Sequence, residues 1–229
     1  MQISHQLRLW NKRRKLGREK PQLYLFPEHK FGYIQIPKVA SRSIRVAVTA
    51  HVSGSSPDQN FAKKLVREYE NRYARHLQQE QIAKLSEQYF LFAFVRNPYD
   101  RIYSCYKNKI EDVRNYGGRN IFEKHGVALD MSFEDFVRLV ATLPDDKSDR
   151  HFRSQAWFLT WQDSLLPAFV GKLEQLNEDW QELQRRFNLA PPPQINVSSK
   201  KALPEMNVET RELICRRYAD DFKLFGYQT

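Results

Sequence analysis

In the stretch FGYIQIPKVASRSIRVAV, residues 31–48, one apolar segment stops at a proline and a second starts a few residues later. The first part, residues 31–36, is short, aromatic and β-branched, which is typical of a buried strand in a parallel sheet. Lys38 and a run of small residues then lead into a helical pattern at about 43–51. The stretch therefore predicts a strand, a tight turn and a helix.

This turn has the features of an anion-binding site. Free backbone N–H groups at the start of a helix attract anions, and small side chains let an anion approach them. Lys38 adds a positive charge, and Ser41 and Ser43 add hydroxyl donors. The turn has no glycine and its lysine comes first, unlike G-x-x-x-x-G-K-[ST], which disfavours a kinase or an ATPase. A plain connection with a surface lysine stays open on these residues alone.

The stretch FAFVRNPYDRIYSCYKNK, residues 92–109, repeats the same order of elements. Residues 90–95 form a second apolar strand pattern, Arg96 follows at its end, and an Asn-Pro pair begins the next helical pattern. The planar guanidinium of Arg96 suits a phosphate, although a structural ion pair is an alternative. Ser104 comes eight residues after Arg96, two turns into the predicted helix.

Further strand and helix patterns alternate along the chain. Residues 165–171 (LLPAFVG) predict a third strand, whose proline favours an edge position or a late start. Helical patterns lie near 43–51, 61–86, 99–113, 132–141, 151–161, 173–188 and 208–220, and residues 190–204 predict a long exposed loop. This alternation predicts a three-layer α/β domain with a mainly parallel sheet, which would bind ligands at the carboxyl ends of its strands.

The net charge of +10 is spread unevenly over the 229 residues. Seven lysines and arginines against one glutamate give residues 1–20 a net charge of +6, so the rest of the chain is close to balance. This favours a basic N-terminal arm, residues 1–29, followed by a single domain, residues 30–229. The arm would be solvated or contact an acidic partner, and the domain is not expected to bind nucleic acid.

Two further features bear on the cellular location. No apolar run approaches the roughly 20 residues that span a membrane, and the charged N-terminus lacks the apolar core of a secretory signal. Cys105 and Cys215 each lie in a helical pattern, which suits reduced thiols better than a disulfide framework. We therefore expect a cytoplasmic protein without a transmembrane segment.

We call the two strand-to-helix turns, after residues 31–36 and after residues 90–95, the two corners. Taken together, they resemble the phosphate-binding motifs of sulfotransferases that use 3′-phosphoadenosine 5′-phosphosulfate (PAPS). In that family a turn of the form P-K-x-x-[ST]-x-[ST] binds the 5′-phosphosulfate. A strand ending in R-[DN]-P, with a serine eight residues after the arginine, binds the 3′-phosphate. The likeness is to carbohydrate-type sulfotransferases and their short bacterial relatives, over about residues 30–227. It includes the blocks HFRSQAWFL (151–159), FVGKLEQLNEDW (169–180), INVSSKK (195–201) and CRRYADDFKLFGY (215–227).

The resemblance implies a P-loop-like sulfotransferase fold and a set of donor-binding residues. These residues are Lys38, Val39, Ala40, Ser41, Arg42, Ser43, Arg96 and Ser104, with Ser198 and Lys200 from the 190–204 loop. Lys38 is implied as a catalytic residue as well. Ala40 and Arg42 depart from the glycine and threonine that are frequent in relatives. Arg42 could contact the sulfonate, an acidic acceptor or only solvent.

Sulfonyl transfer also needs a base for the acceptor hydroxyl, which is worth typically about 10²–10⁴ in rate. Among the six histidines, His76 lies twenty residues before Arg96. The resemblance implies that this is the base, because carbohydrate sulfotransferases with a histidine base carry it in a similar place. His151 is the second candidate, and Arg153 and Gln155 from the same block are candidates for acceptor contact. The sequence near the corners offers no metal-ligand spacing, so no metal is expected.

The sequence is thus similar to a PAPS-dependent sulfotransferase that acts on a hydroxyl of a carbohydrate, with PAPS as the donor co-substrate. One alternative is an inactive relative that still binds the nucleotide, which the departures at Ala40 and Arg42 keep open. The other alternative is a basic module that binds polyanions, which the concentration of charge in the arm disfavours.

Overall fold

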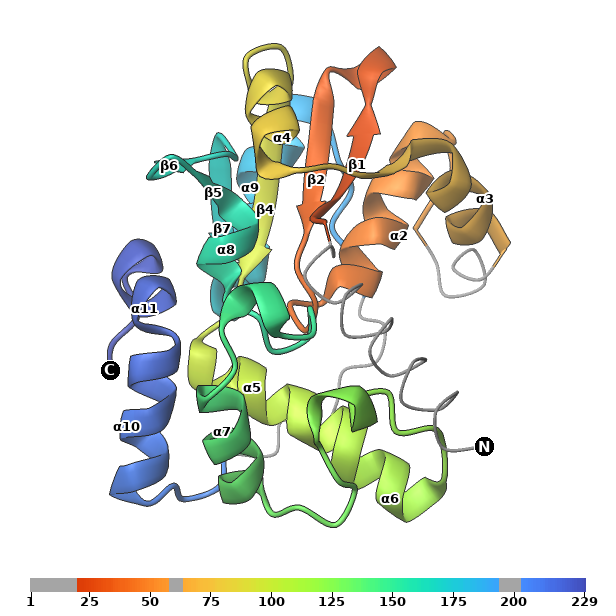
Figure 1. Cartoon of the computed structure of the whole chain (residues 1–229). Helices are drawn as coiled ribbons and strands as arrows, with labels where there is room; N and C mark the ends of the chain where they lie inside the picture. Colours follow the sequence, from red (N-terminus) through yellow and green to blue (C-terminus); the bar gives the residue numbers. More distant parts are fainter. Residues whose placement is uncertain (1–19, 58–63, 194–202) are drawn as a thin grey trace, which may run out of the picture. The chain divides into compact units, whose positions relative to one another are not determined.

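The computed structural model describes residues 20–57, 64–193 and 203–229 (Figure 1). The chain divides into two compact units. The sheet unit contains the described residues of the ranges 20–96 and 158–193, and the helical unit contains residues 97–157 and 203–229.

A five-stranded sheet with the order β3-β1-β2-β4-β7 is the centre of the sheet unit. Its strands are β1 (Gln22–Phe26), β2 (Phe31–Gln35), β3 (Ala74–His76), β4 (Phe90–Val95) and β7 (Phe169–Lys172). Strand β1 runs antiparallel to both of its neighbours, while β2, β3, β4 and β7 all point in the same direction. The prediction of a mainly parallel sheet is therefore confirmed.

Aromatic side chains build one face of this sheet. Tyr24, Tyr33 and Phe92 lie side by side on neighbouring strands, with ring centroids 6.2 and 5.3 Å apart. Trp180, from the helix after β7, stacks on Phe94 at 5.7 Å. All five side chains are almost completely buried, so this face contributes a large share of the apolar surface removed from water.

Helices cover both faces of the sheet, as the predicted three-layer architecture requires. Figure 1 shows α4 in front of the strands and α9 behind them. Helices α2 and α3 reach the aromatic face, where Phe31 contacts His51 and Phe26 contacts Tyr73. The bounds are α2 (Ser41–Val52), α3 (Lys64–Tyr73), α4 (Gln79–Ser86) and α9 (Leu176–Phe187), with short 3-10 helices at Pro27–His29 and Leu173–Gln175.

The third predicted strand, residues 165–171, is split in the structure. Its start belongs to β6 (Ser164–Leu165), which forms a hairpin with β5 (Thr160–Trp161). The two residues between these strands both have positive φ, 49° and 62°, which is the backbone that such a tight turn requires. Strand β7 of the main sheet starts after Pro167, in agreement with the predicted late start, because proline has no N–H to donate to a strand ladder.

The helical unit consists of short helices around an apolar core of its own. Phe122, Phe136 and Phe152 are fully buried in this core, and α7 lies beside α10 (Figure 1). The helices are α5 (Pro98–Tyr106), a π-helical segment (Lys107–Glu111), α6 (Asp112–Tyr116), α7 (Phe133–Ala141), α10 (Val208–Arg217) and α11 (Ala219–Phe225), with 3-10 helices at Glu123–His125 and Asp145–Lys147. Helix α8 (Gln155–Leu159) begins in this unit and ends in the sheet unit.

Two predicted helix starts are confirmed by their capping contacts. The Asn97 side chain accepts a hydrogen bond from the Tyr99 N–H at 3.0 Å, and Pro98 occupies the first helical position of α5. The Ser132 hydroxyl accepts from the Asp135 N–H at 3.1 Å and so caps α7. None of the described helices is long and apolar enough to cross a membrane.

Other boundaries differ from the prediction. The expected helix 61–86 is wrong as a single element, because α3 ends at Tyr73 and strand β3 separates it from α4. The helix expected over 151–161 is reduced to the five residues of α8. Strand β1 was not predicted and lies within the range assigned to the basic arm, residues 1–29. Residues 1–19 of that range, and the acidic partner suggested for them, lie outside the described residues.

Candidate active site

Lys38 and Ala40 shape the turn between β2 and α2. Both residues have a left-handed backbone, with φ of 71° and 54°, a conformation that costs roughly 1–2 kcal/mol in a residue other than glycine. This explains why glycine would suit the position of Ala40. Ala40 is also the N-cap of α2, and alanine has no polar side chain to accept from the first N–H groups of the helix. The helix start therefore presents N–H groups and positive potential to an anion.

Arg96 joins this turn from the neighbouring strand. Strands β2 and β4 are parallel neighbours, so the residues that follow their carboxyl ends lie at the same edge of the sheet. The Arg96 Nη1 atom is 3.5 Å from the carbonyl oxygen of Lys38, a long hydrogen bond that brings the second corner to the first. Both residues are half-buried. The guanidinium of Arg96 therefore lies beside the backbone of the Lys38 turn.

The other residues of the turn differ in exposure. Val39 and Ser43 are buried, Ser41 is half-buried and Arg42 is exposed. The buried pair anchors the turn to the core, while the exposed Arg42 side chain is accessible to a ligand or to solvent. The structure thus leaves the predicted alternatives for Arg42 as they were.

His76 lies at the same edge of the sheet. It is the last residue of β3, which runs parallel to β2 and β4, and its side chain is exposed. Gln22 of β1 pairs with His76 on one side and with Gln35, the last residue of β2, on the other. Adjacent strands lie about 4.8 Å apart, so the backbones of His76 and Gln35 are about 10 Å apart. His76, the candidate base, and Gln35, the last residue of the strand before the Lys38 turn, therefore lie at the same edge of the sheet.

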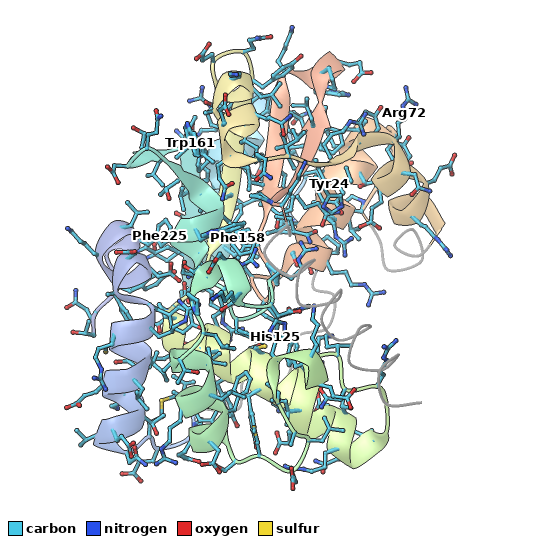
Figure 2. The ribbon with its side chains drawn as sticks, viewed as in Figure 1. Tyr24, Arg72, His125, Phe158, Trp161 and Phe225 are labelled. Atoms are coloured by element: carbon cyan, nitrogen blue, oxygen red, sulfur yellow. The ribbon has the colours of Figure 1, made fainter. Side chains whose placement is uncertain are left out.

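His151 has a carboxylate partner, Asp149, that is not among the residues predicted from the sequence. Its Nδ1 atom is 2.7 Å from Asp149 Oδ1, and its backbone N–H donates to the same oxygen at 3.0 Å. The second carboxylate oxygen of Asp149 is 3.8 Å from both His125 Nε2 and Lys124 Nζ. Figure 2 labels His125 in this helical unit. An Asp-x-His spacing is the only local signal for such a pair, and it is weak.

The pKa values of both partners lie below their ordinary values, for different reasons. Burial lowers the pKa of His151. The Asp149 carboxylate opposes this effect because it favours the charged imidazolium, but burial outweighs it. Lys109 and Arg150 lower the pKa of His151 further. Burial alone would raise the pKa of Asp149, but the neighbouring His125 and His151 hold it well below its usual range. Asp149 is therefore ionised at neutral pH and orients the His151 ring, which has the character of a neutral base.

Arg153 and Gln155 are buried within the helical unit. Arg153 donates from Nη2 to the Ser148 carbonyl oxygen at 2.6 Å and lies over the Trp157 ring at 4.2 Å. Gln155 donates from Nε2 to Asp221, whose carboxylate also accepts from the first N–H groups of α8. These contacts give both residues a structural role, and contact with an acceptor stays a prediction.

The donor-binding role of the remaining predicted residues stays a prediction. Ser104 is half-buried in α5 of the helical unit, whereas Lys38, Arg96 and His76 belong to the sheet unit. Ser198 and Lys200 lie outside the described residues. Among the described residues there is no group of three or more His, Cys, Asp or Glu side chains that could hold a metal ion.

The chemistry of the Lys38 turn fits a donor that carries phosphate and sulfonate groups. Two positive-φ residues, an N-cap without a side-chain acceptor and two nearby cations all favour multiply charged anions. The residues that would hold such a donor in the sheet unit are Lys38 to Ser43 and Arg96. The fold and this corner are those of an α/β protein that binds an anionic ligand at the carboxyl ends of its strands.

Comparison with known proteins agrees with this class. The family model described as "Sulfotransferase family" matches residues 21–228. The chain belongs to the sulfotransferase family. Carbohydrate sulfotransferase 14 from Mus musculus is 25% identical over 221 residues, which cover 87% of this chain and 58% of that protein. Carbohydrate sulfotransferase 10 from Homo sapiens is 23% identical, with coverage of 90% and 67%. Carbohydrate sulfotransferase 12 from Mus musculus is 27% identical, with coverage of 77% and 48%.

The chain spans about 60% of the length of the carbohydrate sulfotransferase 14 proteins that it matches. No solved structure gave a significant match. The family match confirms the expected resemblance, and the low identities make the carbohydrate sulfotransferases relatives of this chain rather than equivalents.

Proposed function

We propose that the chain transfers a sulfonate group from PAPS to a hydroxyl of a carbohydrate. The observation that carries the proposal is that the strands before the Lys38 turn and Arg96, and the strand that contains His76, all end at the same edge of the sheet. Membership of the sulfotransferase family and the likeness to carbohydrate sulfotransferases support the reaction type and the acceptor class.

In this proposal each of the two corners binds a different group of the donor. The N–H groups at the start of α2 and the Lys38 ammonium bind the 5′-phosphosulfate, and the Arg96 guanidinium binds the 3′-phosphate. Ser104, Ser198 and Lys200 complete the donor contacts that the family resemblance implies. His151, Arg153 and Gln155 are proposed on the acceptor side.

The transfer breaks one bond and forms one bond. The acceptor oxygen bonds to sulfur as the bond between sulfur and the 5′-phosphate oxygen breaks, and the electron pair of that bond stays on the phosphate. Lys38 neutralises the charge that grows on the leaving oxygen. His76 takes the proton of the acceptor hydroxyl, so the products are a sulfate ester, 3′,5′-phosphoadenosine and protonated His76. The positioning of donor and acceptor and the fixed charges of the site supply the rest of the rate enhancement. The proposal includes no metal.

The test is turnover of labelled PAPS with a panel of glycan acceptors, with and without a chelator. Transfer of label to a glycan in both conditions is the expected result. Binding of 3′,5′-phosphoadenosine without transfer to any acceptor would favour the inactive nucleotide-binding relative. Absence of nucleotide binding would contradict the donor site itself, and loss of activity on chelation would contradict the metal-free mechanism. The cytoplasmic location expected from the sequence stays a prediction.

A further inference from the structure

A partly buried hydrogen-bond cluster lies on the face of the sheet that carries His76. Its centre is Tyr24 of β1, 2% exposed, whose hydroxyl donates to Glu70 Oε1 at 2.7 Å. The same hydroxyl accepts from Arg45 Nη1 at 3.3 Å and from Gln22 Nε2 at 3.2 Å. Arg45 and Glu70 form an ion pair at 2.7 Å, and Gln35 Nε2 donates to Gln22 Oε1 at 3.1 Å. We call these five residues the Tyr24 cluster. Figure 2 labels Tyr24 where the sheet faces α2.

One side of the Tyr24 cluster belongs to the donor turn. Arg45 lies one turn into α2, the helix whose first residues form the proposed donor site. Gln35 is the last residue of β2, three positions before Lys38. The backbone hydrogen bonds of α2 and β2 hold these two residues in place, so they give the cluster a fixed reference beside the turn.

The other side of the Tyr24 cluster belongs to the segment that carries His76. Glu70 lies one turn before the end of α3, and α3 continues into β3, which ends at His76. Gln22 is the residue of β1 that pairs with His76. Strand β3 has three residues and pairs only with β1 in this sheet, so its backbone contacts alone hold it weakly. The contacts of Glu70 anchor α3, and with it β3, to α2.

The geometry points to the Tyr24 cluster as a positioning group that fixes His76 relative to the Lys38 turn. This inference rests on the proposed role of His76 as the base. Tyr24 and Glu70 touch no reacting atom and act through His76. A misplacement of a reacting group by about 1 Å can cost about a hundredfold in rate, so loss of one contact within the cluster should lower turnover without removing the donor site.

The test compares two variants of the Tyr24 cluster, each made in the wild-type protein and in the His76→Ala protein. We expect Tyr24→Phe and Glu70→Gln each to lower kcat about tenfold, with the Kd for 3′,5′-phosphoadenosine changed less than twofold. In a His76→Ala background the same substitutions should change the residual kcat less than twofold, because no base is left to position. Glu70→Gln keeps the side-chain shape at a site that is 35% exposed, so the fold should tolerate it.

A matched control is Tyr106→Phe, which removes one buried tyrosine hydroxyl and its 2.9 Å hydrogen bond to the Met131 carbonyl oxygen in the helical unit. Its kcat should stay within twofold of the wild type at equal folded fraction. Cluster variants with wild-type kcat, or with equal losses in the wild-type and His76→Ala backgrounds, would overturn the inference. Normal turnover of His76→Ala itself would instead refute the proposed base, so the two failures are distinguishable.

Discussion

His76 and Gln35 end two strands that run in the same direction, and Gln22 of the antiparallel strand between them pairs with both. Directly paired residues place their side chains on the same face of a sheet. The side chains of His76 and Gln35 therefore lie on the same face of the sheet, and both residues lie at the same edge. The proposed base and the proposed donor turn are separate residues at this edge, so each can be replaced by itself.

Replacing His76 by alanine should lower kcat by about 10²–10⁴, the usual contribution of a positioned base. The Kd for 3′,5′-phosphoadenosine should stay near the wild-type value, because the base acts only in the transition state. Acceptor-saturated turnover and calorimetric titration measure the two effects. His29→Ala is the control, since His29 lies in the connection of β1 to β2 at the opposite end of the sheet. If His151→Ala were inactive while His76→Ala turned over normally, the base would belong to the helical unit.

Replacing Lys38 by alanine should reduce turnover more than donor binding. Charge on the bridging oxygen of the donor grows as the bond to sulfur breaks, so the ammonium is worth most in the transition state. The measurement compares kcat with the Kd for 3′,5′-phosphoadenosine in the same variant. An equal loss in both quantities would mean that Lys38 binds donor and transition state alike.

Replacing Arg96 by alanine should weaken nucleotide binding by about 1.5–3 kcal/mol, as expected for a lost charge-assisted contact. Arg96→Lys keeps the charge but loses the planar fork, so it should recover only part of the affinity. Calorimetric titration with 3′,5′-phosphoadenosine measures both variants. Wild-type affinity in Arg96→Ala would remove this residue from the donor site.

Replacing Ala40 by glycine should stabilise the fold by about 0.5–1 kcal/mol. Relief of the left-handed backbone of Ala40 outweighs the extra entropy that glycine has in the unfolded chain. The control is Ala47→Gly in the interior of α2, which should destabilise the fold by about 1 kcal/mol or more. Urea unfolding measures both changes in the free energy of unfolding. Equal destabilisation by the two substitutions would contradict the strain assigned to the turn.

Replacing Asp149 by asparagine should lower the pKa of His151 further. Burial already lowers this pKa, and the Asp149 carboxylate is the group that opposes it by favouring the imidazolium. Titration of the imidazole signals by NMR gives the pKa directly. Asp145→Asn is the control, because its carboxylate pairs with Arg217 rather than with His151. A raised or unchanged pKa in Asp149→Asn would show that the carboxylate does not govern His151.

The two corners could be predicted from the sequence because each is a local pattern. An apolar strand, a cation and a helix start are consecutive at Lys38 and again at Arg96, and parallel strands bring their carboxyl ends to one edge. The helix starts at the Asn-Pro pair and near residue 132 follow from local sequence for the same reason. His76 was selected by family resemblance, since nothing local distinguishes it from the other histidines.

What only the tertiary structure decided is the setting of His76. The segment Ala74–His76 has no strand pattern of its own and becomes β3 only because β1 offers backbone partners 50 to 54 residues away in the chain. The Tyr24 cluster likewise joins side chains from two strands and two helices. Local sequence specifies turns and caps, because their hydrogen bonds close within a few residues. Pairing across a sheet depends on which distant segments the core brings together, and no single stretch of the chain contains that information.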